Sequence, residues 1–148
     1  MDLVIPDSIE PYIGYKCLRW DGAGSLWSLA FHMKWPQGEK ATATCMRGRV
    51  HDAPAPHCGC GIYAAHIEEA SRYYAPDRVM IQVALWGTTQ IHWTGARGQF
   101  AYPQKILVYP DKPTNHRMAR LVAELYGIPV SIETPDPVAI RRGLRQGQ

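Results

Sequence analysis

The first third of the chain alternates between short apolar and aromatic runs and sequences that favour turns. The runs at 12–20 and 26–33 are separated by Asp-Gly-Ala-Gly at 21–24, which predicts two strands joined by a loop. Trp-Pro-Gln-Gly at 35–38 predicts a second turn, and the alternating run at 40–46 predicts a third strand. Together these runs predict an antiparallel meander.

Two later segments have the spacing of amphipathic helices. The first covers 62–74 and is followed by Pro76, which disfavours helical geometry in the residue before it. The second covers 114–126, with Thr114 as a candidate N-cap and Gly127 as a stop signal. The tail predicts at most one further helical turn, with residues 141–148 flexible.

Apolar runs between and after these helices predict further strands. The run at 79–86 is apolar nearly throughout and should be central, whereas 88–94 alternates and should be half exposed. Gly-Ala-Arg-Gly at 95–98 predicts a turn before a long strand at 99–109, where Pro103 favours an edge or a bulge. A short strand is predicted at 128–133. We therefore expect a single domain over residues 1–148 of class α+β, mainly an antiparallel β-sheet of about six strands with two or three helices.

Residues 47–61 interrupt this pattern with a segment that has few side chains to pack. It holds two Pro, three Gly, two Cys and two His, so it needs a source of order other than a hydrophobic core. Cys45, His51, Cys58 and Cys60 fall within sixteen residues, spaced Cys-x5-His-x6-Cys-x-Cys. Thiolate sulfur and imidazole nitrogen are the ligands of structural zinc, and four of them close a tetrahedral site. We therefore expect a structural Zn²⁺ site that stabilises this loop.

The same residues allow other interpretations. His57 competes with His51 for the fourth ligand position, and Cys17 is a further candidate if its strand lies beside Cys45. The cysteines could also be ordinary buried thiols, or could take part in disulfide or redox chemistry. Spacing alone does not separate these alternatives, and we favour metal binding because it would supply the loop with a source of order.

The run H-D-A-P-A-P-H-C-G-C-G-I-Y-A at 51–64 resembles a motif in small uncharacterised proteins of actinobacteria and their phages. There the motif is similarly preceded by a Gly-Tyr strand and a Trp-Pro-x-Gly turn, here at 14–20 and 35–38. It is followed by an apolar strand ending in Trp-Gly and by an Ala-Tyr-Pro segment, here at 86–87 and 101–103. The resemblance spans residues 12–130 and implies a shared fold and cluster, without an activity.

Composition is that of an ordinary globular protein, with 46% hydrophobic and 20% charged residues. The formal net charge of +3 is too small to require a nucleic-acid partner. No run approaches the roughly 18 apolar residues of a membrane span, and the first residues lack the basic and apolar regions of a signal peptide. Four cysteines without an export signal favour thiols or ligands over disulfides, so we expect a cytoplasmic location.

These observations favour a small zinc-stabilised binding or regulatory protein that acts on a protein partner. By analogy, the resemblance suggests a phage-encoded, host-interacting role. Nucleic acid is the second candidate partner, because cations and an aromatic ring could contact phosphates and stack on bases. The residues that suggest such binding are Arg47, Arg49, Trp93 and Arg97.

A zinc- or Cys/His-dependent hydrolase is the third class. Cys58 or Cys60 could act as a nucleophile beside a histidine, or an open zinc site could use Glu68 as a base. A closed site would use the thiolates as ligands, so we assign no catalytic residue.

Overall fold

The computed structural model describes residues 3–5 (backbone only), 10–30, 33–45, 47, 51–109 and 116–133. Its elements in chain order are β1 (Leu3–Ile5), β2 (Tyr12–Trp20), β3 (Leu26–Trp27), β4 (Lys34–Trp35), β5 (Ala41–Thr42), β6 (Ile62–Ala65), α1 (Ile67–Ala70), a 3-10 turn (Ser71–Tyr73), β7 (Arg78–Ile91), β8 (Gly95–Val108), α2 (His116–Tyr126) and β9 (Val130–Ile132). The fold class is α+β and mainly β, as predicted. The described strands form one sheet of nine rather than about six.

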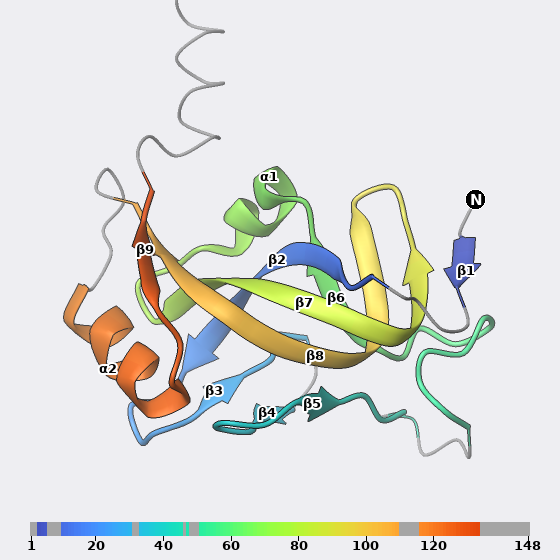
Figure 1. Cartoon of the computed structure of the whole chain (residues 1–148), viewed down its shortest axis with the longest axis horizontal. Helices are drawn as coiled ribbons and strands as arrows, with labels where there is room; N and C mark the ends of the chain where they lie inside the picture. The colour runs from blue at the N-terminus through green and yellow to red at the C-terminus, as the bar shows by residue number, and fades with distance from the viewer. Residues whose placement is uncertain are drawn as a thin grey trace, which may run out of the picture.

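The sheet is built around the long β7–β8 hairpin, which crosses the centre of the molecule (Figure 1). β2 pairs antiparallel along β7, and β6 pairs with both β8 and β2. The pairings of β2, β7, β8 and β6 therefore form a closed ring. Of the described strands, only β9 runs parallel to its neighbour, β8, which makes the sheet mixed.

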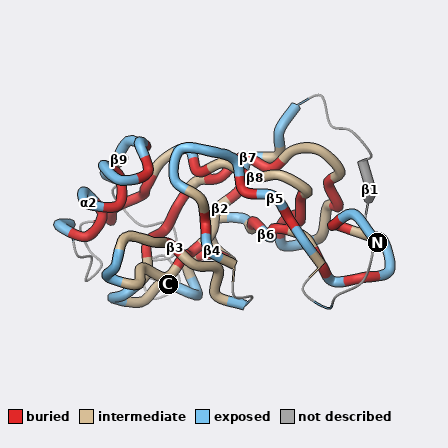
Figure 2. Tube along the Cα trace, turned by 90° about the horizontal axis from the view of Figure 1, so that it is seen from below, coloured by how far each residue is buried: buried red, intermediate tan, exposed pale blue. Residues whose placement is uncertain are grey.

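The two faces of the hairpin enter different hydrophobic clusters. Val79 and Ile81 lie in the larger cluster together with the buried face of α2, whereas Met80 lies in a smaller cluster with Ala70 of α1. Because successive side chains of a strand point to opposite faces, the two helices pack on opposite faces of the sheet. Figure 2 shows buried stretches inside the strands and exposed stretches in the loops and on part of α2.

The predicted helix at 62–74 is wrong in its first part. Residues Ile62–Ala65 form β6, and the short helix α1 begins only at Ile67. The side chains of Ile62 and Ala64 are buried while Tyr63 is exposed, and this alternation suits a strand paired on both sides. The segment that follows the cysteines is therefore anchored in the sheet.

Other boundaries differ because strands run through sequences that favour turns. The predicted turn at 95–98 is wrong, since these residues lie in β8 and the hairpin turns at 92–94. The predicted strands at 79–86 and 88–94 are one strand, β7, with a register shift between Trp86 and Thr89. Of the edge or bulge predicted at Pro103, the bulge is confirmed, since Pro103 pairs with Val83 while Lys105 pairs with Gln82.

The predicted antiparallel pairing of the first two strands is confirmed by β2 and β3, but the third predicted strand is wrong as part of a meander, because β3 pairs next with β4, which was not predicted, and β5 pairs with β8. The predicted strand at 26–33 is reduced to β3, and Trp35, expected in a turn, belongs to β4. Helix α2 ends before Gly127, whose φ is +66°, as predicted.

Three predictions fall outside the described residues: the N-cap Thr114, the binding residue Arg49 and the flexible tail. In the part of the chain that the structure describes, no helix has the length and apolar character needed to cross a membrane.

Candidate metal centre

The four predicted ligands Cys45, His51, Cys58 and Cys60 come together in the structure. One ligand atom from each lies within 4.8 Å of the others. Cys45 follows β5, whereas Cys58 and Cys60 precede β6, and both strands pair with β8. Because β8 holds both ends, the intervening segment is folded back on itself. We call this segment, described at 45, 47 and 51–61, the cysteine loop.

The spacing of the ligand atoms fits a tetrahedral ion. With Zn–S and Zn–N bonds of about 2.3 and 2.1 Å, a tetrahedron separates two sulfurs by about 3.8 Å, and sulfur from nitrogen by about 3.6 Å. The Sγ atoms of Cys45 and Cys58 are 3.7 Å apart, and His51 Nε2 lies 3.3 Å from Cys60 Sγ. The cysteines are free thiols. The cluster could therefore hold a metal ion, and its donor set fits Zn²⁺.

The two alternative ligands lie elsewhere. His57 is exposed and does not belong to the group of converging ligand atoms. Cys17 is buried in the smaller hydrophobic cluster, where its thiol donates to the Ala70 carbonyl at 3.4 Å. The structure thus brings His51, rather than His57 or Cys17, to the three cysteines.

Local hydrogen bonds favour the metal-binding form of one thiol. A hydrogen bond that the Cys58 sulfur accepts from the Cys60 backbone amide lowers the pKa of Cys58 to about 7, against the opposing effect of burial. Burial raises the pKa of the Cys60 thiol. Because the thiolate is the form that binds metal, Cys58 is close to its binding state near neutral pH. A bound cation would supply the charge that keeps Cys60 deprotonated.

Arg97 holds the cysteine loop against β8. It was predicted to lie in a turn and to contact a partner, but it lies within β8 and is only 4% exposed. Its guanidinium donates to the carbonyls of Cys58, Cys60 and Ala55, the last two at 3.0 and 3.2 Å. Its Nε donates to Gln90 Oε1 at 2.6 Å. The buried guanidinium therefore fixes three backbone positions around the cluster.

The charge of Arg97 provides a second observation that fits a metal–thiolate centre. Among the described residues, no carboxylate forms an ion pair with Arg97. A buried cation without a counter-charge is costly. Three thiolates, one neutral imidazole and Zn²⁺ would carry one net negative charge. Such a centre, on the loop that Arg97 binds, would offset the guanidinium.

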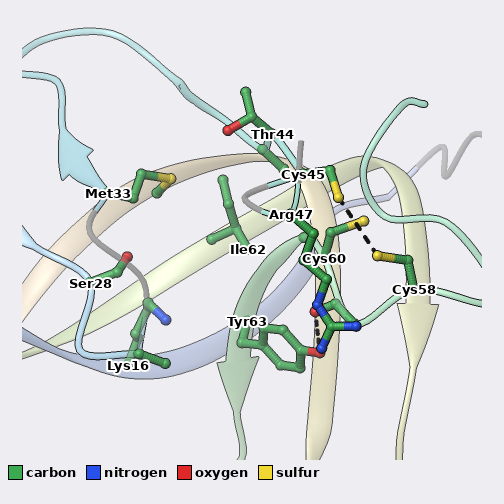
Figure 3. Close-up of a pocket in the computed structure, with 14 residues that line it drawn as sticks. Lys16, Ser28, Met33, Thr44, Cys45, Arg47, Cys58, Cys60, Ile62 and Tyr63 are labelled. Atoms are coloured by element: carbon green, nitrogen blue, oxygen red, sulfur yellow. Dashed lines mark hydrogen bonds between the residues drawn. The ribbon is translucent and has the colours of Figure 1, made fainter. Parts of the chain in front are cut away.

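A cavity of about 300 Å³ opens beside the cluster, and Figure 3 shows its lining. Cys45, Cys58 and Cys60 contribute to one wall. The predicted binding residue Arg47 is exposed and also lines the cavity, whereas Trp93 lies at the tip of the β7–β8 hairpin. The binding residues predicted from sequence therefore do not form one surface.

Two polar residues near the candidate centre, Gln90 and Lys16, were not predicted from the sequence. Gln90 is buried beside Arg97, and Lys16 lines the cavity from β2. Each occupies a single polar position in a strand, which gives no sequence signal of its role.

Comparison of the chain with protein-family models, curated proteins and solved structures found no match. The fold and the cluster define an α+β protein with a candidate Cys₃His metal centre.

Proposed function

We propose that this is a small zinc protein whose Cys₃His centre orders the cysteine loop and which acts by binding a protein partner. The convergence of four ligand atoms within 4.8 Å carries the zinc part of this proposal. Four protein ligands fill a tetrahedral coordination shell and leave no position for water or substrate. A structural role therefore has more support than hydrolysis.

Protein binding is supported by an aromatic surface, which we define as Tyr63, Tyr73 and Trp93. Their exposed fractions are 38%, 52% and 85%. Tyr63 and Tyr73 line a second cavity of about 520 Å³ together with His92, whose ring stacks on Tyr63 with centroids 6.0 Å apart. Trp93 does not line this cavity but follows His92 directly in the chain. Exposed Tyr and Trp side chains are typical anchors of protein interfaces.

One hydrogen bond connects this surface to the metal centre. The Tyr63 hydroxyl donates to the Gly59 carbonyl at 2.8 Å, and Gly59 lies between two of the proposed ligands. An ordered cysteine loop therefore helps to fix the position of the Tyr63 side chain, which is one of the proposed aromatic anchors. The nucleic-acid alternative has less support, because Arg97 is buried and cannot reach a phosphate.

The partner can be trapped with a photoreactive phenylalanine derivative at position 93, in an actinobacterial extract as the resemblance suggests. Binding of the purified partner is then measured by calorimetry. We expect Trp93→Ser to weaken binding at least about tenfold, as for interface hot spots. Ile132→Ser should leave binding unchanged, because Ile132 is 68% exposed but lies on β9. Equal affinity of the two variants, or crosslinks only to nucleic acid, would contradict protein binding through this surface.

A further inference from the structure

The cavity beside the metal centre contains an unpartnered cation. Lys16 lines it from β2, and none of the described residues forms a hydrogen bond or ion pair with the Lys16 ammonium. Figure 3 shows its side chain reaching into the space beside Ser28. Burial lowers the pKa of Lys16 to about 8, because the ammonium has lost much of its hydration, and the neighbouring Cys17 thiol offsets only part of this effect. The site would therefore be stabilised by an anion.

Apart from the cysteines of the proposed metal centre, the charged side chains of the described lining have one sign. Arg47 supplies a second cation, and the described lining includes no Asp or Glu. The hydroxyl groups of Ser28 and Thr44 add neutral polar groups to the lining, whereas the Tyr63 hydroxyl already donates to the Gly59 carbonyl. This arrangement favours a negatively charged ligand over a neutral or cationic one.

The remaining walls are apolar. They are formed by Ala30, Met33, Ala43 and Ile62. The volume of about 300 Å³ is at the lower end of the range for small-molecule sites. A ligand that fills this space would combine one anionic group with a short apolar chain.

We propose that this cavity binds a small organic carboxylate, whose anionic group pairs with the Lys16 ammonium and whose apolar chain lies against Met33 and Ile62. The site goes beyond the proposed protein binding: Tyr63 of the aromatic surface lines it, but Tyr73 and Trp93 do not. Lys16, Ala30 and Tyr63 also line the second cavity, so a bound carboxylate would lie next to the aromatic surface.

Hexanoate is a suitable probe, and hexanamide is its neutral counterpart of similar size. We expect calorimetry on the zinc-loaded protein at pH 7 to show hexanoate binding at least tenfold more tightly than hexanamide. Lys16→Met should weaken hexanoate binding at least tenfold. Lys34→Met is the matched control, because Lys34 is exposed on β4 and should leave the affinity unchanged.

A second measurement does not depend on the folding of a variant. In the unmodified chain, hexanoate should slow reductive methylation of Lys16 at least threefold, measured by mass spectrometry, and should not slow methylation of Lys34. No protection of Lys16, or equal affinity for hexanoate and hexanamide, would overturn the proposal. Binding that persists in Lys16→Met and perturbs the spectrum of the cobalt-substituted centre would also overturn it, because the carboxylate would then ligate the metal. Trp93→Ser should retain hexanoate binding, which separates this test from that of the aromatic surface.

Discussion

Arg97 supplies hydrogen-bond donors to backbone carbonyls of the cysteine loop. Its guanidinium contacts three loop carbonyls and Gln90 while remaining almost fully buried. A planar guanidinium can serve several acceptors at once, which the single ammonium of lysine does with less geometric precision. The residue therefore links the order of the loop to the register of the sheet.

Replacing Arg97 by Met should remove this donor from Gln90, from the buried carbonyls of Cys58 and Cys60, and from the partly buried carbonyl of Ala55. Each unsatisfied buried group costs about 1–3 kcal/mol, so we expect the free energy of unfolding of the zinc-loaded protein to fall by at least about 3 kcal/mol. Urea denaturation followed by tryptophan fluorescence measures this change. Arg97→Lys should recover only part of it.

The matched control for this substitution is Arg72→Met, because the Arg72 side chain is 73% exposed and its ion pair with Glu69 spans 3.7 Å at the surface. Surface pairs of this kind contribute roughly 0–1 kcal/mol. If Arg97→Met destabilised the protein no more than Arg72→Met, the assignment of Arg97 as the support of the loop would be wrong.

At the scale of residues, the sequence predicted the four-ligand cluster but did not predict that Arg97 holds the cysteine loop in place. Cys45, His51, Cys58 and Cys60 were identified because ligand types at short spacing constrain a loop locally. Arg97 was assigned to a turn because its partners are distant in sequence: Gln90 opposes it across the hairpin, and the loop carbonyls are about forty residues away. Such pairings depend on register, which side-chain types alone do not specify.

At the scale of elements, the bulge in β7 determines which residues of the hairpin face each other. Gly87 has φ +72° and lies where the register shifts, before Gln90 pairs with Arg97. A Cβ at this position would lie 2.6 Å from Gln99 Oε1 and 2.8 Å from Phe100 Cδ2. Both the backbone conformation and the space therefore require glycine.

We expect Gly87→Ala to reduce the free energy of unfolding by about 2–3 kcal/mol, combining the strain of positive φ with a steric clash. Gly22→Ala is a matched control, since Gly22 has φ +75° but a Cβ added there would meet nothing within 4 Å. It should cost only about 1 kcal/mol. The comparison is made by urea denaturation, and a smaller loss for Gly87→Ala than for Gly22→Ala would refute the steric role of this bulge.

Small residues explain the main errors in predicting the elements. Gly95 begins a strand rather than a turn, because β6 passes so close that a Cβ there would lie 2.1 Å from the Ala64 carbonyl oxygen. Glycine is needed at position 95 because β6 packs closely against it. A local sequence pattern cannot distinguish such a glycine from one that forms a turn. By contrast, β2 and α2 were predicted well, because their apolar patterns reflect burial that is visible locally.

At the scale of the whole molecule, the sheet and the metal centre have separate roles. Cys58 and Cys60 contribute to the larger hydrophobic cluster, but its fully buried members lie in the strands and in α2. A chain of 148 residues can bury a substantial core without a metal ion. Metal binding should therefore order the cysteine loop and Tyr63 rather than create the fold. Its loss is expected to lower the thermal midpoint while the sheet remains folded.

The most direct test of this account combines metal analysis with thermal unfolding of the purified protein. The parent and His57→Ala should each contain one equivalent of zinc. Cys60→Ser and His51→Ala should lose zinc and melt several degrees lower, as a ligand that binds only the folded state stabilises it. Full thermal stability of the parent without metal, or zinc retained in Cys60→Ser and lost in His57→Ala, would contradict the assignment of a Cys45–His51–Cys58–Cys60 centre.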